Sequence, residues 1–330
     1  MAGMNTANMD LLIRSEIWSG DLKKTLEDQL MATKYVDWLD GFPDGSTFTI
    51  PSIGTIDVND YTEDTAVEYS GMDTGEFQFS ITDYISSATY ITQKARQDSF
   101  YAAKLEANFV PAMSRSIAER VEADILKQGQ PGTANGQTVA NLNAINGAAH
   151  RWVGSTLDST KQVIGLEDFA RARHALKMAN VPDTNLIAIV DPSVEYLLNT
   201  LTNLVNVSNN PRWEGIVEGG IGQGMSFVKN VYGFDVYTSN RLALSGAGQT
   251  GASETIGGVA STGASKANLF FSATSDILPW MGAWRQMPKV DAEWNKDFQR
   301  EEYVTTARYG LKTYRRENLV TVLSDPSIVG

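Results

Sequence analysis

The chain has 330 residues, enough for one large hydrophobic core or two smaller ones, and its 42% hydrophobic content is that of a globular protein. It contains no cysteine, which excludes disulfides, thiol nucleophiles and cysteine metal ligands. No apolar run reaches the roughly 18 residues that a membrane-spanning helix needs. The first ten residues are polar, so we expect no secretory signal.

The net charge of -12 is concentrated in one segment. Between Tyr35 and Gln93 the chain has eleven acidic residues and no Lys or Arg. Binding to nucleic-acid phosphates requires Lys and Arg, so this distribution argues against a nucleic-acid-binding protein. The segment is either a solvated acidic face or a surface that meets a basic patch on another subunit. On the second interpretation, the predicted inter-subunit contacts are Asp57, Asp60, Glu63, Asp64, Glu68, Asp73 and Glu76.

The first elements predicted along the chain are an N-terminal arm and a β-ribbon. Residues 10–34 place apolar side chains at helical spacing, interrupted by Gly20, which predicts a loose arm with a short helix. Residues 47–91 change to the pattern of strands, most clearly at 77–82, where apolar and polar residues alternate. The simplest structure is a long hairpin or extended loop. A two-stranded ribbon is marginal alone, so we expect it to dock on a neighbour.

A long helix is predicted over residues 97–128, where apolar residues recur at every fourth position. Pro111 lies inside this segment and is predicted to kink the helix. A ridge of aromatic, aliphatic and methionine side chains is more typical of a buried core than of a cofactor site. The predicted core residues of this helix are Tyr101, Leu105, Phe109, Met113, Ile117, Val121 and Ile125.

A small α/β unit is predicted in the middle of the chain. Residues 129–154 are rich in Gly, Asn, Ala and Gln and predict a loop before it. Within the unit we expect a helix over 166–180, a short buried strand over 186–190, and a second helix that Asp191 caps and Pro192 begins.

The last third of the chain is predicted to be mainly strand. Residues 234–238 predict one strand, and 268–278 and 288–323 predict others. In the last of these, alternate residues from Tyr303 to Leu311 share one face. Residues 245–266 are mostly Gly, Ala, Ser and Thr, which predicts an exposed, mobile loop.

No constellation of residues predicts catalysis. The two histidines, His150 and His174, lie 24 residues apart, unlike the close spacing of histidine-based metal or acid–base sites. The glycine-rich residues 219–224 lack the spacing of a dinucleotide fingerprint, which Met225 breaks. The acidic residues lie in turn-rich sequence without an apolar pocket that would raise a carboxyl pKa. The sequence therefore predicts no catalytic, cofactor-binding or metal site.

Several stretches, taken in their order along the chain, carry a family resemblance. They are IPSIG at 50–54 leading into EFQFSITD at 76–83, SIAERVEADIL at 116–126, ALKMANVP at 175–182 followed by IVDP at 189–192, and GFDVYTSN at 233–240. Together they resemble the major capsid proteins of tailed double-stranded DNA bacteriophages, which have the Johnson, or Hong Kong-97, fold. In that family they would be the extended loop, the end of the spine helix, and the axial domain.

The resemblance implies an α+β chain with this capsid fold, divided into five segments. These are an N-terminal arm (1–40), an extended β-ribbon loop (41–95), a peripheral domain with the spine helix (96–160), an axial domain (161–285), and C-terminal strands that return to the peripheral domain (286–330).

The resemblance also implies a structural role rather than an enzymatic one. The subunit would self-assemble into hexamers and pentamers that form an icosahedral shell around double-stranded DNA. Its implied partners are copies of itself, a scaffolding protein, a portal protein and optional decoration or cement proteins, with packaged DNA near it only non-specifically. The implied location is the virion capsid, and the host cytoplasm during assembly.

Two features depart from the family pattern, and two other functions stay open. Asp183-Thr184-Asn185 stands where relatives often carry an Arg, and Lys94 does not match well the position of a cross-linking lysine. No long helical N-terminal extension is recognisable, which implies a separate scaffolding protein. The alternatives are an encapsulin-type shell with the same fold, which neighbouring genes would distinguish, and a small α/β enzyme, which would form only small oligomers.

Overall fold

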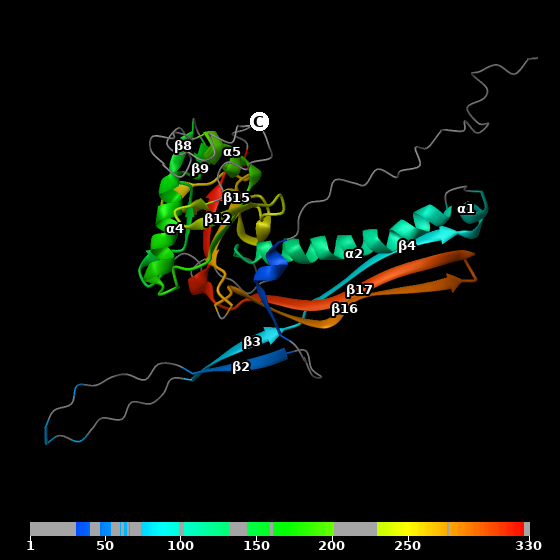
Figure 1. The fold of residues 1–330 in the computed structure, drawn as a ribbon, viewed down its shortest axis with the longest axis horizontal. Coiled ribbons are helices and arrows are strands. Elements are labelled where there is room, and N and C mark those ends of the chain that lie inside the picture. Colours follow the sequence, from blue (N-terminus) through cyan, green and yellow to red (C-terminus); the bar gives the residue numbers. More distant parts are fainter. Residues whose placement is uncertain are drawn as a thin grey trace, which may run out of the picture.

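The computed structural model describes residues 31–39, 47–53, 60, 63–64, 66, 74–98, 102–131, 144–158, 161–200, 230–275 and 277–326. In this part of the chain an elongated region and a globular region are joined by one long helix (Figure 1). The predicted helix of the N-terminal arm, in residues 10–34, lies almost wholly outside the described residues; η2 (Ala32–Tyr35), a 3-10 helix, follows where the description begins.

The elongated region is a four-stranded sheet with the long helix α2 (Ala102–Lys127) running along it (Figure 1). The strand order is β1 (Val36–Leu39), β16 (Trp280–Asn295), β17 (Arg300–Thr313) and β4 (Asp83–Thr92). β1 runs parallel to the start of β16, and β17 runs antiparallel to both of its neighbours. A short helix, α1 (Gln93–Asp98), connects β4 towards α2.

The core of this region lies between α2 and β17. Met113, Ile117, Val121 and Ile125 are each 5% exposed or less. Alternate residues of β17 from Tyr303 to Tyr309 are buried, which is the face that the strand pattern predicts. The helix ridge and this strand face are therefore two sides of one apolar layer.

Three members of the predicted ridge fall outside what is described. Tyr101 lies outside the described residues, and Leu105 and Phe109 lie in α2 with side chains that are not described. Pro111 was expected to kink the helix; it lies inside α2, which continues through it as one helix (Figure 1).

The globular region is built on a six-stranded sheet. Its strand order is β11 (Asn230–Val231), β12 (Phe234–Thr238), β10 (Leu186–Val190), β15 (Lys266–Ser272), β18 (Val320–Ser324) and β7 (Arg151–Val153). Helices α4 (Leu166–Met178) and α5 (Pro192–Thr200) pack on one face, and the end of α2 packs on the other. All five residues of β10 are buried, because both faces of the sheet are covered.

The predicted start of α5 is confirmed by its cap. The backbone N–H of Ser193 donates to Asp191 Oδ2 at 3.1 Å, and Pro192 is the first helical residue. Small two-stranded elements surround the sheet. They are β5 (Ala144–Ile145) with β6 (Ala148–Ala149), β8 (Thr156–Asp158) with β9 (Lys161–Val163), and β13 (Thr255–Ile256) with β14 (Val259–Ala260).

The prediction of a loop over residues 129–154 is wrong in its second half. Arg151, Trp152 and Val153 form β7, which pairs in parallel with β18. All three residues are buried, so the strand shows no alternation of apolar and polar residues, and three residues are too few to give a pattern.

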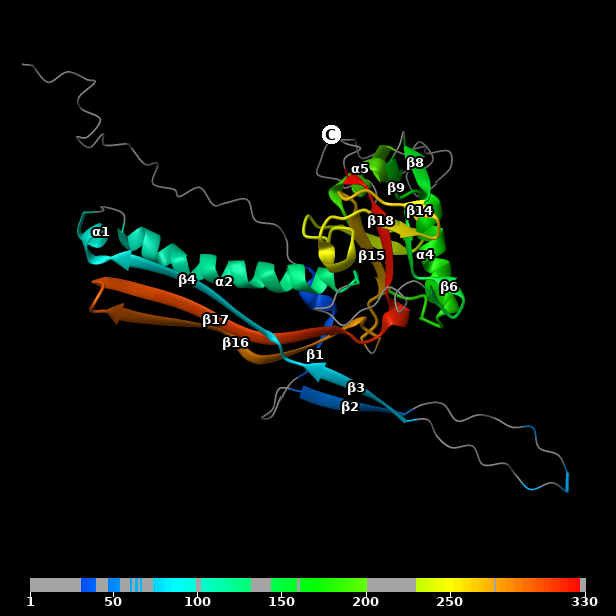
Figure 2. The ribbon, with the colours of Figure 1, turned by 180° about the vertical axis from the view of Figure 1, so that it is seen from behind.

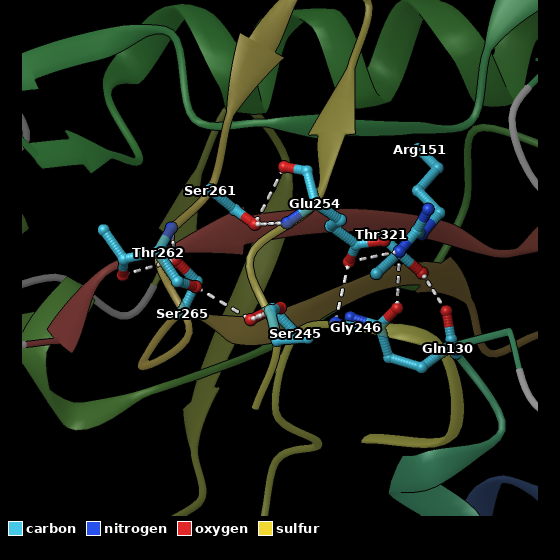
Figure 3. A network of polar contacts seen from close by, with 11 residues as sticks. Gln130, Arg151, Ser245, Gly246, Glu254, Ser261, Thr262, Ser265 and Thr321 are labelled. Atoms are coloured by element: carbon cyan, nitrogen blue, oxygen red, sulfur yellow. Dashed lines mark hydrogen bonds and ion pairs between the residues drawn. The ribbon is translucent and has the colours of Figure 1, made fainter. Parts of the chain in front are cut away.

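The prediction of an exposed, mobile loop over residues 245–266 is also wrong. Ser245, Ser261 and Ser265 are 3% exposed or less. Ile256 belongs to a small apolar cluster, and Figure 3 shows the hydroxyl groups of the segment in hydrogen bonds beside it. Ser245 Oγ lies 2.8 Å from the carbonyl oxygen of Thr262, and Ser261 Oγ lies 3.1 Å from both the backbone nitrogen and the carbonyl oxygen of Glu254. Small polar residues therefore order this segment.

A buried ion pair fixes the same segment to the sheet. Arg151 of β7 is 1% exposed, and its Nη2 lies 2.5 Å from Glu254 Oε1 and 2.7 Å from Gln130 Oε1 (Figure 3). The backbone N–H of Gly246 donates to the same carboxylate at 3.2 Å. Arg151 therefore joins the edge strand β7 to Gln130, just after α2, and to Glu254 of the β12–β15 connection.

The C-terminal strands divide between the two regions. β17 packs beside α2, whereas β18 enters the six-stranded sheet between β15 and β7. The boundaries predicted for the five segments of the chain stay predictions.

The buried ridge can be tested at Ile117, which is 3% exposed. We expect Ile117→Asp to yield insoluble protein, because it places an unpaired charge in the apolar layer. Ile117→Ala should lower the free energy of unfolding by about 2–5 kcal/mol, measured by chemical denaturation. Ser116→Asp, on the neighbouring exposed position, is the control. Soluble, assembly-competent Ile117→Asp protein would contradict the assignment.

The buried ion pair can be tested by Glu254→Ala. The change leaves the Arg151 guanidinium buried without its carboxylate, and we expect a loss of about 3–5 kcal/mol in the free energy of unfolding. Glu301→Ala is the control, because Glu301 pairs with Arg96 at a 2.7 Å distance on the surface, where such pairs contribute at most about 1 kcal/mol. Equal losses in the two variants would argue against the buried pair.

Candidate assembly surfaces

A β-ribbon projects from the elongated region (Figures 1 and 2). It consists of β2 (Thr47–Ile53) and β3 (Thr74–Ser80), which pair antiparallel along their whole length, as the sequence pattern predicts. β4, whose residues gave the same strand pattern, instead pairs with β17. The hairpin is therefore shorter than residues 47–91.

The base of the ribbon is held by the end of β17. Lys312 Nζ donates to the carbonyl oxygen of Gln78 at 2.8 Å and lies 4.8 Å from the ring centroid of Phe77. The ring of Phe77 also packs edge-on against Tyr314, with centroids 5.0 Å apart. These contacts join the root of the ribbon to the body, where Phe77 also packs against the cluster of Ile81 and Ala283.

Four of the seven acidic residues predicted as inter-subunit contacts are described. Asp60, Glu63, Asp64 and Glu76 are exposed, and Asp57, Glu68 and Asp73 lie outside the described residues. Asp64 has a positive φ of 63°, a backbone conformation that Asp and Asn tolerate better than most residues do. The described acids of the ribbon thus face solvent in a single copy of the chain.

A second surface, which the sequence reasoning missed, lies at the far end of the long hairpin of β16 and β17. Tyr90 and Phe298 are 56% and 65% exposed. The guanidinium of Arg300 lies 4.4 Å from the Tyr90 ring centroid and 4.6 Å from that of Phe298. Exposed aromatic residues gathered around an arginine are typical of the energetic centre of a protein interface.

The edge of the elongated sheet is a third surface. Within the described part of the chain, β1 pairs with β16 from Trp280 to Ala283 and the rest of β16 forms the edge. Residues 284–289 are irregular and include Pro288, whereas 290–295 pair regularly with β17. A regular edge strand offers unpaired backbone groups to another chain. This surface therefore suits contact between chains.

Comparison with known proteins identifies the family of the chain that carries these surfaces. A family model described as phage capsid protein matches residues 74–322, which is most of the chain. The chain belongs to the phage capsid protein family. Comparison with curated protein sequences gives no match.

Solved phage capsids share the fold of this subunit. The capsid of cyanophage P-SCSP1u is 14% identical with a TM-score of 0.68, covering 97% of this chain and 94% of that one. The mature capsid of bacteriophage PhiM1 is 12% identical with a TM-score of 0.66, covering 96% and 94%. A chain of Mycobacterium phage Che8 is 16% identical with a TM-score of 0.63, covering 93% and 96%.

Family and fold together answer the main questions that the sequence raised. The chain is an α+β protein consistent with the Johnson fold, and it is a structural subunit of a phage shell, associates with copies of itself and is located in the virion capsid. The match favours the phage capsid over the encapsulin-type shell and the small α/β enzyme.

One histidine of this capsid protein is buried and the other is exposed. His150 is 1% exposed beside the carbonyl oxygen of Ala148, and burial lowers its pKa. His174 is exposed on α4. Among the described residues, no group of three or more His, Asp or Glu side chains could hold a metal ion. None of the described helices is long and apolar enough to span a membrane.

The residues that depart from the family pattern make a local contact. Asp183 pairs with Arg173 at 2.5 Å and with Lys177 at 2.9 Å, and these two hydrogen-bonded cations lower the pKa of Asp183 to about 2. The carboxylate thus ties the connection before β10 to α4 on the surface of the globular region.

The anchoring of the ribbon can be tested by Lys312→Ala. Loss of the bond to Gln78 and of the contact with Phe77 should speed amide hydrogen exchange in residues 74–81 about tenfold, which is about 1.4 kcal/mol. Lys289→Ala is the control, because Lys289 pairs only with exposed Asp291 among the described residues. Exchange in residues 74–81 that stays at the parent rate would show that Lys312 does not hold the ribbon.

Proposed function

We propose that this subunit forms hexamers and pentamers that close into an icosahedral shell around double-stranded DNA. The observation that carries the proposal is the ribbon, which is fixed to its own chain at the base while its exposed acids extend away. A two-stranded ribbon is marginally stable alone, so a neighbouring subunit is its natural support. A closed shell needs several distinct patches on each subunit, and the chain offers three.

The three surfaces differ in chemistry and would make different contacts. The acidic ribbon suits a basic patch on the adjacent subunit, where charge complementarity would favour the correct register. The aromatic cluster around Arg300 suits a buried contact between copies. Contacts of this obligate kind bury on the order of 2,000 Å² or more.

The other partners that we propose follow from the same function. A scaffolding protein would direct assembly in the host cytoplasm, a portal protein would occupy one vertex, and decoration or cement proteins would bind the finished shell. Packaged DNA would lie near the subunit without specific contacts. The acidic balance of the chain supports this last point, because a basic wall would bind phosphates and resist packing and release.

The role of the ribbon charge can be tested by replacing Asp60, Glu63, Asp64 and Glu68 with Lys. We expect a folded subunit that fails to form particles or forms aberrant ones, because attraction to the neighbour becomes repulsion. Circular dichroism would check the fold, and size-exclusion chromatography with electron microscopy would check assembly.

The matched control replaces the same four residues with Asn or Gln. It removes the charge, keeps the side-chain size and retains a residue suited to the positive φ at position 64. We expect weakened assembly, intermediate between the parent and the lysine variant. Normal particles from the lysine variant would mean that the ribbon charge is merely solvated.

A further inference from the structure

A buried carboxylate on α2 holds the point where the N-terminal segment joins the body. Glu122 is 1% exposed. Its Oε1 accepts the backbone N–H groups of Met31 at 3.0 Å and Ala32 at 2.8 Å. Its Oε2 accepts those of Ala32 at 3.0 Å and Thr33 at 3.3 Å. One side chain therefore binds three successive backbone donors about 90 residues away in the sequence.

These bonds cap η2. Its own N-cap residue, Met31, offers no side-chain hydrogen bond, and the first N–H groups of a helix need acceptors. Glu122 supplies both a negative charge at the positive end of this helix and the missing acceptors. Ala32 is fully buried, so water cannot replace the carboxylate there.

Glu122 differs from the other acids of the same helix. Glu119 pairs with Arg115 and with Arg241, each at 3.0 Å, and Asp124 pairs with Arg120 at 2.9 Å. Among the described residues no Lys or Arg pairs with Glu122, whose partners are backbone N–H groups. A buried charge is tolerated only when it is hydrogen-bonded. Glu122 and residues 31–33 therefore stabilise each other.

The segment after residue 33 packs on both regions of the molecule. The ring of Tyr35 meets Phe271 of the six-stranded sheet edge-on, with centroids 5.2 Å apart. Trp38 stacks on Trp284 of β16 at 5.0 Å, and its Nε1 donates to the carbonyl oxygen of Thr33 at 3.1 Å. Residues 31–39 are thus fixed in direction as well as in place.

We propose that Glu122 is the positioning residue of the N-terminal arm: by holding residues 31–33, it sets where residues 1–30 leave the body and so where the arm meets a neighbouring copy. The inference rests on the proposed function, because it assigns the arm a contact between subunits. The acids at positions 119 and 124 pair with cations and do not bind residues 31–33.

The test compares Glu122→Gln with Glu119→Gln in the full chain. Glutamine keeps the size of Glu122 but carries no charge. Its NH2 group cannot accept a hydrogen bond, so one of the two carboxylate oxygens is lost as an acceptor for residues 31–33. We expect amide hydrogen exchange over residues 31–35 to speed at least about tenfold in Glu122→Gln, while residues 117–127 and 186–190 keep their parent rates. Glu119→Gln should leave all three segments unchanged.

Two results would contradict the proposal that Glu122 holds residues 31–33 in place. One is exchange over 31–35 at the parent rate, whatever happens to assembly. The other is equal acceleration over 31–35 and 117–127, which would mean that Glu122 only stabilises the packing of α2. Glu122→Asp separates charge from geometry, because it keeps the charge but moves the carboxylate oxygens away from residues 31–33. We expect its amide exchange over 31–35 to speed up as in Glu122→Gln. Exchange at the parent rate in Glu122→Asp would contradict positioning by these hydrogen bonds.

Particle formation by the same variant tests the arm separately. We expect Glu122→Gln to yield at least about tenfold fewer closed particles than the parent at equal protein concentration, counted by electron microscopy. Faster exchange over 31–35 together with a parent-like particle yield would support the role of Glu122 in holding residues 31–33. It would refute the proposed contact between the arm and a neighbouring copy. The two failures are therefore distinguishable.

Discussion

The structure depends on the packing of the C-terminal part of α2 between two sheets. Val121, Ile125 and Leu126 are 2% exposed or less and belong to one apolar cluster with Phe271 of the globular sheet and Trp280 of the elongated sheet. One helix therefore supplies the core of both regions. A displacement of either sheet would open this shared core, and close-packed interiors resist such a change. The two regions consequently behave as one stiff plate.

A polar contact supports the same junction. Tyr309 of β17 is fully buried and donates to Asp124 Oδ2 at 2.7 Å. Burial, together with this bond and the nearby negative charge, raises the pKa of Tyr309, so its phenol stays a donor across the physiological range. The sheet is thus tied to the helix by a directional bond in addition to apolar packing, which fixes the rotation of α2 about its own axis.

Local periodicity made much of this core predictable. The ridge through Ile117 and the alternating face of β17 follow from spacing alone, and the apolar run of β10 indicates a strand covered on both faces. The Ser- and Gly-rich connection was not predictable, because Ser245 is ordered by carbonyl groups that its own sequence does not specify. The pairing of Glu122 with residue 32 spans 90 positions and leaves no local pattern. The same limit applies to the exposed aromatic cluster, because Tyr90 comes from β4 and Phe298 from the turn between β16 and β17.

The acidic residues of the plate and those of the ribbon differ in whether cations lie near them. In the plate, acids such as Asp124, Asp183 and Glu254 lie beside Arg or Lys of the same chain. Between Tyr35 and Gln93 the sequence contains no cation, so the acids there have none close by along the chain. Like-charged ribbons repel one another, which opposes pairing between ribbons of free subunits. Under the proposed function, a cationic patch on a neighbour would remove that repulsion, and the charge that keeps single subunits apart would also select the correct contact.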